Sequence, residues 1–402
     1  MLRRVVLVAR VAATVMALIR LGRAGRRRPP LESASTTSAS TTPANTTAAS
    51  TAPANTTSAS TTSASTASAV PTISVVVPAR DEAERIGPLL DVLVGAGAAS
   101  AALLPAAVEV IVVDDESTDA TAAVAAAAGA RVVTGAPLPV HWAGKAWALQ
   151  QGVEAATGDW VVALDADTRP SPDLPRALVT RAVADDLEFV SVGGRFECPT
   201  PGAAWLHPAL LTTLVYRFGP SGYAGPIRAD RQLANGQCMA FPRRAFLAAG
   251  GFLPVAHHVV EDVALVRHLA DKGWRVAMLD GSSLLTTRMF DDFGHTWRGW
   301  SRSIALPGVE RRRWQVVDLA VLLVTQASPL PRLLFRRADA LDLVLLAARL
   351  GTMVGTADAY EHRTAAYWAS PLADVPAVAA VATGVVRSLL GRGHRWRGRT
   401  YP

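Results

Sequence analysis

Acidic residues follow three short apolar runs of this sequence, at the point where each run ends. In the third case Asp165-Ala-Asp167 comes directly after residues 160–164. Alternate side chains of an extended chain point to the same side, so the two carboxylates present paired oxygen ligands. Such ligands suit a hard divalent ion, Mg²⁺ or Mn²⁺, which could neutralise a leaving diphosphate. Asp-x-Asp is common by chance, and its position after a buried strand is what favours a metal site.

The other two acidic motifs are Pro78–Glu82, after residues 73–77, and Asp114–Asp119, after residues 109–113. Open α/β sheets bind ligands outside the carboxyl ends of their strands, so these motifs are candidates for donor binding. For either motif alone, helix capping is the more probable explanation, because Asp81 and Ser117 occupy N-cap positions.

Lys145 is unusual because the sequence contains only two lysines against 38 arginines. A compact ammonium at the start of a helix, after Gly144, suits a phosphate group. An exposed helix residue with no ligand explains the position equally well.

A second acidic pair, Glu261-Asp262, opens a helical stretch after two adjacent histidines. A carboxylate here could accept the proton of an attacking hydroxyl. Unpaired backbone N–H groups at a helix start should keep such a carboxylate ionised near neutral pH. For Glu261 the preferred interpretation is a helix-start acid without a catalytic role.

The stretch Trp297-Arg298-Gly299-Trp300 is expected in a helix close to the apolar C-terminal part of the chain. These side chains could line a groove for a lipid or a sugar. Tryptophans at a membrane interface need no catalytic explanation, and the sequence leaves both interpretations open.

The elements that must position these residues alternate between strand and helix, which predicts a largely parallel α/β sheet. The expected strands are residues 73–77, 109–113, 131–133, 160–164, 189–192 and 275–278. The expected helices are residues 81–95, 118–128, 145–156, 172–184, 261–272 and 292–303.

Charge and hydropathy favour a membrane over a nucleic acid. The 402-residue chain has a net charge of +7, but residues 1–28 carry eight arginines and no acid. Five more arginines lie in the acid-free tail between Arg387 and Arg399. Basic charge beside apolar segments suits anionic lipid head groups, and a mean hydropathy of +0.24 suits a mixed protein. Two cysteines suggest neither a disulfide framework nor a zinc site.

Four segments are expected. Residues 1–28 form a basic apolar anchor or surface helix, residues 29–70 a disordered Ser/Thr/Ala-rich linker, residues 71–313 the catalytic domain, and residues 314–402 membrane-associated helices with a basic tail. The abrupt change of composition at Val70 predicts that removal of Met1–Ala69 leaves the fold and donor binding intact. A soluble helical subdomain remains an alternative for the last segment.

Taken in order, the motifs resemble family 2 glycosyltransferases with the GT-A fold. The matching stretches are ISVVVPARDE (73–82), VIVVDDESTD (110–119), GKAWALQQG (144–152), GDWVVALDAD (158–167), NGQCMAFPRRAF (235–246) and GGF…VEDVAL (250–265). Residues 288–303 and the tail WRGRTYP resemble the membrane enzymes of this family that are associated with hopanoid and carotenoid glycosylation.

The resemblance implies roles for individual residues. Pro78, Arg80, Glu82 and Asp114 would hold the nucleotide, Asp165 would contact nucleotide or metal, Asp167 would bind Mg²⁺ or Mn²⁺, and Asp262 would be the general base. Together with the phosphate candidate Lys145 and the acceptor-side candidates Glu261, Trp297, Arg298 and Trp300, these are the expected site residues. Arg80-Asp81 departs from the small residues or Asn usual in the first motif, which leaves base recognition open.

The resemblance implies inverting transfer of a sugar from a nucleotide diphosphate to a lipid-type acceptor, by an enzyme of the inner membrane that faces the cytoplasm. A polysaccharide synthase or a polyprenyl-phosphate sugar transferase is the alternative on the same fold. The Gln-x-x-Arg-Trp motif of processive synthases is absent near Trp297, which favours a single transfer. A non-catalytic nucleotide-sugar-binding protein is the alternative of another class, and the presence of all three aspartates argues against it.

Overall fold

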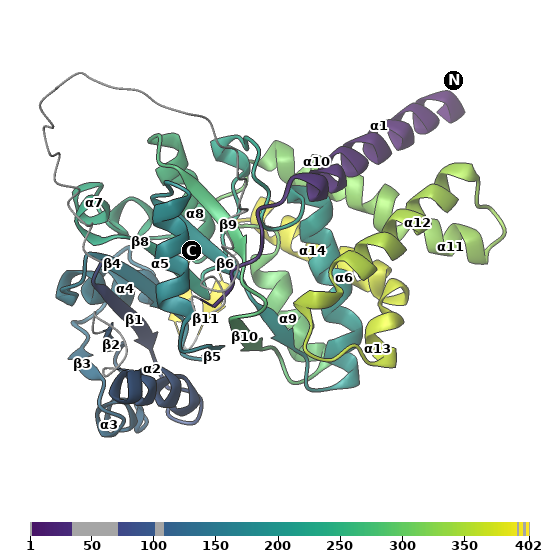
Figure 1. Cartoon of the computed structure of the whole chain (residues 1–402). Coiled ribbons are helices and arrows are strands. Elements are labelled where there is room, and N and C mark those ends of the chain that lie inside the picture. Colours follow the sequence, from purple (N-terminus) through teal and green to yellow (C-terminus); the bar gives the residue numbers. More distant parts are fainter. Residues whose placement is uncertain (1, 34–70, 101–107, 392–393, 397–398, 402) are drawn as a thin grey trace, which may run out of the picture.

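A mixed seven-stranded sheet forms the centre of the computed structural model (Figure 1), which describes residues 2–33, 71–100, 108–391, 394–396 and 399–401. The strand order is β3-β2-β1-β4-β8-β6-β9. β3, β2, β1 and β4 are parallel, and β8 runs antiparallel to both β4 and β6. The strands are β1 (Ile73–Ala79), β2 (Val108–Asp114), β3 (Arg131–Thr134), β4 (Trp160–Leu164), β6 (Phe189–Gly193), β8 (Cys238–Pro242) and β9 (Val276–Asp280).

Helices cover both faces of this sheet because the central strands are apolar on both sides. Val75 and Val77 of β1 pack in one apolar cluster with α2, α3 and α5, and the intervening Val76 packs in another with α4, α7 and α8. The helices are α2 (Gly87–Ser100), α3 (Thr121–Ala127), α4 (Gly144–Ala155), α5 (Leu174–Ala184), α7 (Arg243–Ala248) and α8 (Glu261–Asp271), with the 3₁₀ turns η3 (Ala229–Arg231) and η4 (Leu253–Val255). The α/β class is therefore confirmed.

A second lobe of helices packs beside the sheet (Figure 1) around α6 and α14. It takes α6 and α9 from inside the expected catalytic segment and the rest from the C-terminal segment. Its helices are α6 (Pro201–Phe218), α9 (Phe293–Ser303), α10 (Arg312–Leu322), the π-helical turn η5 (Leu323–Ala327), α11 (Pro329–Leu334), α12 (Ala340–Gly355), η6 (Ala357–Ala359), α13 (Ala365–Trp368), η7 (Ser370–Ala373) and α14 (Asp374–Leu389).

Two small sheets complete the described fold. β5 (Thr168–Pro170), β10 (Leu285–Arg288) and β7 (Arg195–Glu197) form one of them, directly after the Asp165-Ala-Asp167 motif. β11 (His394–Trp396) and β12 (Arg399–Tyr401) pair near the C-terminus.

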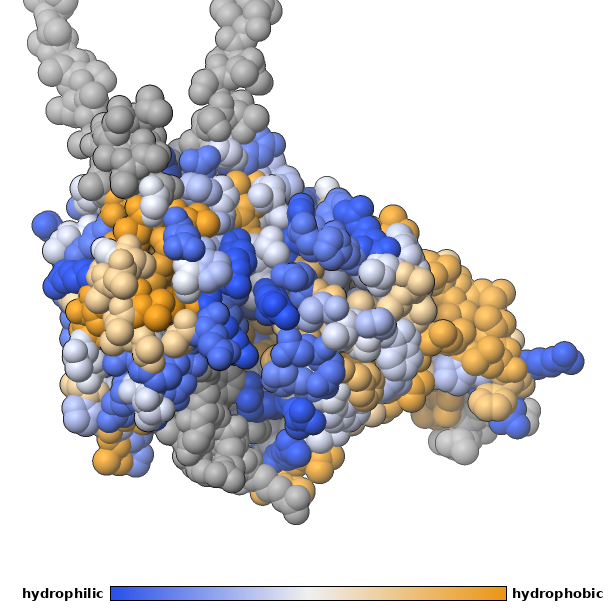
Figure 2. Space-filling model, turned by 90° about the horizontal axis from the view of Figure 1, so that it is seen from below, coloured by the Kyte–Doolittle hydropathy of each residue, from blue (hydrophilic) through white to orange (hydrophobic). Residues whose placement is uncertain are grey.

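Three helical segments of the described residues are long and apolar enough to cross a membrane: Arg4–Arg26, Arg312–Leu334 and Ser370–Leu389. The expected apolar stretch 340–354 forms α12 but is not among them. Large apolar side chains such as Ile19, Leu334 and Val354 are exposed on these helices and on α12. Figure 2 shows apolar surface gathered over the helical end of the molecule, which is compatible with membrane association.

The described part of the N-terminal segment packs against the fold, so the expected tolerance to removal of Met1–Ala69 stays a prediction that these contacts do not favour. Arg20 of helix α1 (Leu2–Gly22) is buried, and its Nη2 lies 3.0 Å from the buried Asp318 carboxylate. After the turn η1 (Arg23–Arg26), Leu31 is only 2% exposed in the core cluster that contains β1. The expected linker therefore begins after Ser33, and its residues 34–70 lie outside the described part of the chain.

We expect Leu31→Ala to lower the free energy of unfolding by about 2–3 kcal/mol, because it removes a buried leucine from a packed core. The measurement is thermal or denaturant unfolding of the full chain in detergent. Leu253→Ala is the matched control, since Leu253 is 63% exposed and its loss should change stability by no more than about 0.5 kcal/mol. Equal effects of the two substitutions would contradict the packing of the N-terminal segment.

Candidate active site

The loops that follow β1 and β2 are tied to each other by side chains. The Asp81 carboxylate accepts hydrogen bonds from the Thr118 N–H, at 2.8 Å, and from the Thr118 hydroxyl, at 3.1 Å. In return the Asp81 N–H donates to the Ser117 hydroxyl at 3.1 Å. Asp81 and Ser117 thus fix one loop against the other instead of capping the helices that follow them. The pairing holds the first two acidic motifs at one edge of the sheet.

Arg80 and Glu82 both line a cavity at this edge, together with Pro78. The Arg80 guanidinium donates to the Asp115 carbonyl at 2.7 Å, which joins the first motif to the second. Asp115 lines the cavity as well, whereas the expected nucleotide ligand Asp114 is not among its lining residues. Asp114 is the last residue of β2, and the chain turns toward the cavity only after it.

Lys145 connects the Asp165-Ala-Asp167 motif to the start of α8. Its ammonium lies 2.7 Å from the Asp165 carboxylate and 3.2 Å from the Glu261 carboxylate. Burial lowers the pKa of Lys145, but the two carboxylates outweigh it and the pKa ends above its ordinary value. Lys145 is therefore held as a cation at the centre of the site.

Among the described residues no Lys, Arg or His forms an ion pair with the Asp167 carboxylate, whereas Asp165 pairs with Lys145. Burial, with a further contribution from the negative charge of Asp165, raises the pKa of Asp167 above its ordinary value. A cation bound between the two carboxylates would reverse this shift.

Asp262 occupies the first turn of α8, where its carboxylate accepts two backbone hydrogen bonds. The Gly236 N–H donates to Oδ2 at 2.7 Å, and the Val263 N–H donates to Oδ1 at 2.8 Å. Burial and the adjacent Glu261 nevertheless raise the pKa of Asp262 to about 7. The expectation that the helix start alone keeps this group ionised is wrong in direction, because desolvation and a like charge exceed the effect of the N–H donors.

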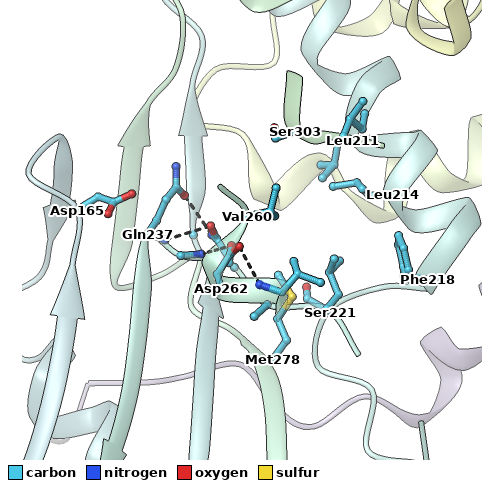
Figure 3. A pocket seen from close by; sticks show the side chains of 18 of the residues that line it. Asp165, Leu211, Leu214, Phe218, Ser221, Gln237, Val260, Asp262, Met278 and Ser303 are labelled. Carbon is cyan, nitrogen blue, oxygen red and sulfur yellow. Dashed lines mark hydrogen bonds between the residues drawn. The ribbon is translucent and has the colours of Figure 1, made fainter. Parts of the chain in front are cut away.

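A cavity of about 630 Å³ joins these polar groups to the helical lobe. Figure 3 places Asp165 on one side of Asp262 and the α6 side chains Leu211, Leu214 and Phe218 on the other. Lys145, Asp167 and Glu261 line the polar part, and Trp300 and Ile304 contribute to the apolar part. The cavity is therefore lined by charged side chains at the strand ends and by apolar side chains of the helical lobe.

Most of the expected site residues line this cavity, and three do not. Asp114, Trp297 and Arg298 are not among the lining residues. Trp297 stacks on Phe293 with ring centroids 6.3 Å apart, and Arg298 is exposed on α9. Trp297 and Trp300 are three residues apart and pack against the same apolar cluster, but only Trp300 lines the cavity.

Several lining residues were not expected. Gly236 and Gln237 come from the loop before β8, and Arg27 and Arg28 come from the N-terminal segment. Gly236 leaves space that a side chain would fill, because an added Cβ would lie 3.1 Å from Lys145 Nζ and 3.2 Å from Asp262 Oδ2. The stretch NGQ was visible in the sequence within one quoted motif, but nothing local indicated the two arginines.

The polar end of the cavity fits a divalent ion that takes its ligands partly from the protein and partly from the substrate. No group of three or more His, Cys, Asp or Glu side chains suited to a metal occurs among the described residues. Mg²⁺ typically binds through one or two carboxylates and substrate phosphates, and does not need a complete protein cage. The buried carboxylate of Asp167, whose pKa is raised by burial and by the neighbouring Asp165, matches that arrangement.

Comparison with known proteins finds similarity over part of the chain. Residues 74–246 match the family model of glycosyl transferase family 2. A comparison with curated proteins finds no match.

Among solved structures, a mycobacterial protein is 27% identical over 58% of this chain and 73% of its own, with a TM-score of 0.40. Glucosyl-3-phosphoglycerate synthase from Mycobacterium tuberculosis, solved with Mn²⁺, UDP and glucosyl-3-phosphoglycerate, is 26% identical over 58% and 78%, with a TM-score of 0.40. The mannosyltransferase PcManGT from Pyrobaculum calidifontis, in complex with GDP-mannose and Mn²⁺, is 18% identical over 80% and 88%, with a TM-score of 0.45.

The matched segment contains β1, β2, β4 and β8 and so supplies the carboxylates of the first three motifs. The remaining acidic pair, Glu261 and Asp262, lies beyond the match and reaches the same cavity through Lys145 and Gly236. Over residues 74–246, somewhat less than half of its 402 residues, the chain matches glycosyl transferase family 2, which supports a glycosyltransferase.

Proposed function

We propose that this enzyme transfers a sugar from a nucleotide diphosphate donor to a lipid-type acceptor in the membrane, of the hopanoid or carotenoid kind. The observation that carries the proposal is the single cavity that runs from the carboxylates at the strand ends to the apolar face of α6. A charged donor and an apolar acceptor require opposite surroundings, and this cavity offers both within one space.

The donor would occupy the polar end. Pro78, Arg80 and Glu82 line the part of the cavity next to the first two strands, where the nucleotide would lie. Asp114 stays a proposed nucleotide residue through its position beside Asp115. Lys145, held at the N-terminus of α4, suits the diphosphate as a point charge.

Asp165 and Asp167 would hold Mg²⁺ or Mn²⁺ together with the donor phosphates. When bound, the ion would supply positive charge to the leaving diphosphate. The protein groups would orient the donor and keep water away from it, which favours transfer to the acceptor over hydrolysis.

Asp262 would act as general base toward the acceptor. Its carboxylate would take the proton of the acceptor hydroxyl while the hydroxyl oxygen bonds to the anomeric carbon and the bond from that carbon to the diphosphate oxygen breaks. Attack opposite the leaving group inverts the anomeric configuration. Glu261 and Trp300 line the cavity near this reaction, and Trp297 and Arg298 stay proposed residues of the acceptor side.

The test is incubation of membranes that contain the protein with labelled UDP-sugars and GDP-sugars, followed by lipid extraction. We expect label in a neutral lipid product that requires the protein. Label in a polymer would support a polysaccharide synthase instead, and label in an acid-labile polyprenyl phosphate would support that transferase. Donor binding without any labelled product would support a non-catalytic binding protein.

We also propose that the catalytic domain faces the cytoplasm from the inner membrane. The arginine clusters 26–28 and 311–313 adjoin two of the three apolar helices, as the excess of positive charge on cytoplasmic segments requires. Protease added to intact cells should leave residues 72–313 uncut, and cleavage there before permeabilisation would place the domain outside.

A further inference from the structure

The N-terminal segment Arg23–Ser33, which we call the strap, follows α1 along the chain (Figure 1). Its residues Arg27 and Arg28 line the cavity. Its backbone pairs with the loop after α6: Arg27 and Tyr223 form an antiparallel bridge. The Arg28 N–H donates to the Gly222 carbonyl at 2.7 Å, and the Ala224 N–H donates to the Arg26 carbonyl at 2.9 Å. The strap therefore pairs with this loop through backbone hydrogen bonds.

The side chain of Arg27 joins this loop to the central sheet. Its Nε donates to the Ser221 carbonyl at 2.8 Å, and its Nη2 donates to the Asp280 carboxylate, at the end of β9, at 2.6 Å. A guanidinium can make both bonds because its donors point in fixed, different directions, whereas a lysine ammonium is a point charge on a flexible stem.

The loop held in this way forms a wall of the cavity. Most residues of the loop from Phe218 to Ile227 line the cavity. Gly219 and Gly222 have positive φ angles, 89° and 82°, so the loop follows a path that depends on glycine. The loop also bonds to β9, because the Gly222 N–H donates to the Met278 carbonyl at 2.7 Å.

The same wall reaches the proposed base. The Arg23 guanidinium donates to the Phe218 carbonyl at 2.9 Å. Phe218 packs in one apolar cluster with Val260 and Val263, the residues on either side of Glu261-Asp262. A change in the strap can therefore reach the acceptor wall and the start of α8 through direct contacts.

We infer that the strap shapes the acceptor side of the cavity and that Arg27 is a positioning residue, which sets the loop 218–225 against β9. The expected change in acceptor use rests on the proposed transfer to an apolar acceptor, whereas the positioning of the loop by Arg27 does not. It connects α1, a candidate membrane span, to the reaction space, so the membrane anchor and the acceptor site form one structural unit.

The test compares Arg27→Ala, Arg27→Lys and Arg26→Ala in the full-length protein. Arg26 is the matched control, because it is the adjacent arginine, is exposed and does not line the cavity. Hydrogen–deuterium exchange of residues 218–225, without substrate, should be about tenfold or more faster in Arg27→Ala, as expected for the loss of charge-assisted hydrogen bonds. Arg26→Ala should match the wild type, and Arg27→Lys should be intermediate.

Transfer is then measured in vesicles of a lipid extract of the producing cells, diluted to different degrees with dioleoylphosphatidylcholine. In Arg27→Ala the fraction of extract needed for half-maximal transfer should rise about threefold to tenfold, while UDP affinity measured with Mn²⁺ by calorimetry changes less than about twofold. Unchanged exchange in the loop, or equal losses of UDP and acceptor affinity, would overturn the inference. If the wild type made no lipid product, the proposed function would fail, and the exchange result would still decide the role of Arg27.

Discussion

Asp167→Ala is expected to lower the transfer rate about 10²- to 10³-fold, because it removes a carboxylate that would hold the divalent ion against the donor diphosphate. The same substitution should abolish the strengthening of UDP binding by Mn²⁺. Both quantities can be measured on the purified protein, the first with labelled donor and the second by calorimetry with and without Mn²⁺.

Asp271→Ala provides the control for this substitution. Asp271 is an exposed acid at the end of α8 and does not line the cavity. It should leave the rate and the response to Mn²⁺ unchanged. Full activity of Asp167→Ala in excess chelator would contradict the metal assignment, whereas loss of rate with an intact Mn²⁺ response would place Asp167 on the donor sugar instead of the ion.

The sheet could be predicted well from the sequence because its strands are short runs of Val and Ile bounded by turn residues. Residues 160–164 match β4 in full, and the expected 73–77 and 109–113 differ from β1 and β2 by no more than two residues at an end. β8 was missed, because Cys238–Pro242 contains no β-branched residue and ends in proline. Its antiparallel direction makes the sheet mixed, and it positions Gly236 and Gln237.

Two helices differ from those expected from the sequence, and each difference has a physical reason. Helix α6 was missed because Pro208 lies inside it and because nearly all of its faces are buried, so no polar face marks its period. The expected helix 81–95 begins only at Gly87. Asp81 has a positive φ of 53° and its carboxylate bonds to Thr118, so the preceding residues form the loop that binds the second motif.

The candidate site could be predicted in its polar part and not in its apolar part. The strand-end carboxylates share one edge because parallel strands end together, which follows from the order of the motifs. The role of the N-terminal arginines could not be deduced, because their partners are distant in sequence: Arg20 pairs with Asp318, Arg27 with Asp280 and Arg10 with Asp339. Basic residues beside an apolar helix suggested lipid contact, and only the fold brings them to these acids.

The pKa of Asp262 predicts how transfer depends on pH. Burial and Glu261 raise this pKa to about 7, so below pH 7 a growing share of the molecules carries a protonated Asp262 that cannot accept a proton. We expect kcat to rise with pH through about 7, where it reaches half of its maximum, and to level off at higher pH. The raised pKa has the opposite effect on stability: the folded state binds this proton more tightly than the unfolded state, so this contribution to stability is present at low pH and is lost as pH rises through about 7.

Asp262→Asn is therefore expected to lower kcat about 10²- to 10⁴-fold, the usual contribution of a general base, and to remove the pH dependence near 7. UDP affinity should change little, and the protein should be at least as stable as the wild type at pH 8, because the substitution removes a buried charge next to Glu261. Glu261→Gln is the matched comparison on the same helix turn. It removes the negative charge from the 3.2 Å ion pair with Lys145, so it should change UDP binding more and slow transfer less than Asp262→Asn. If Asp262→Asn kept near-normal turnover while Glu261→Gln lost it, the base would be Glu261, and the Gly236 N–H would serve to hold Asp262 as a structural acid.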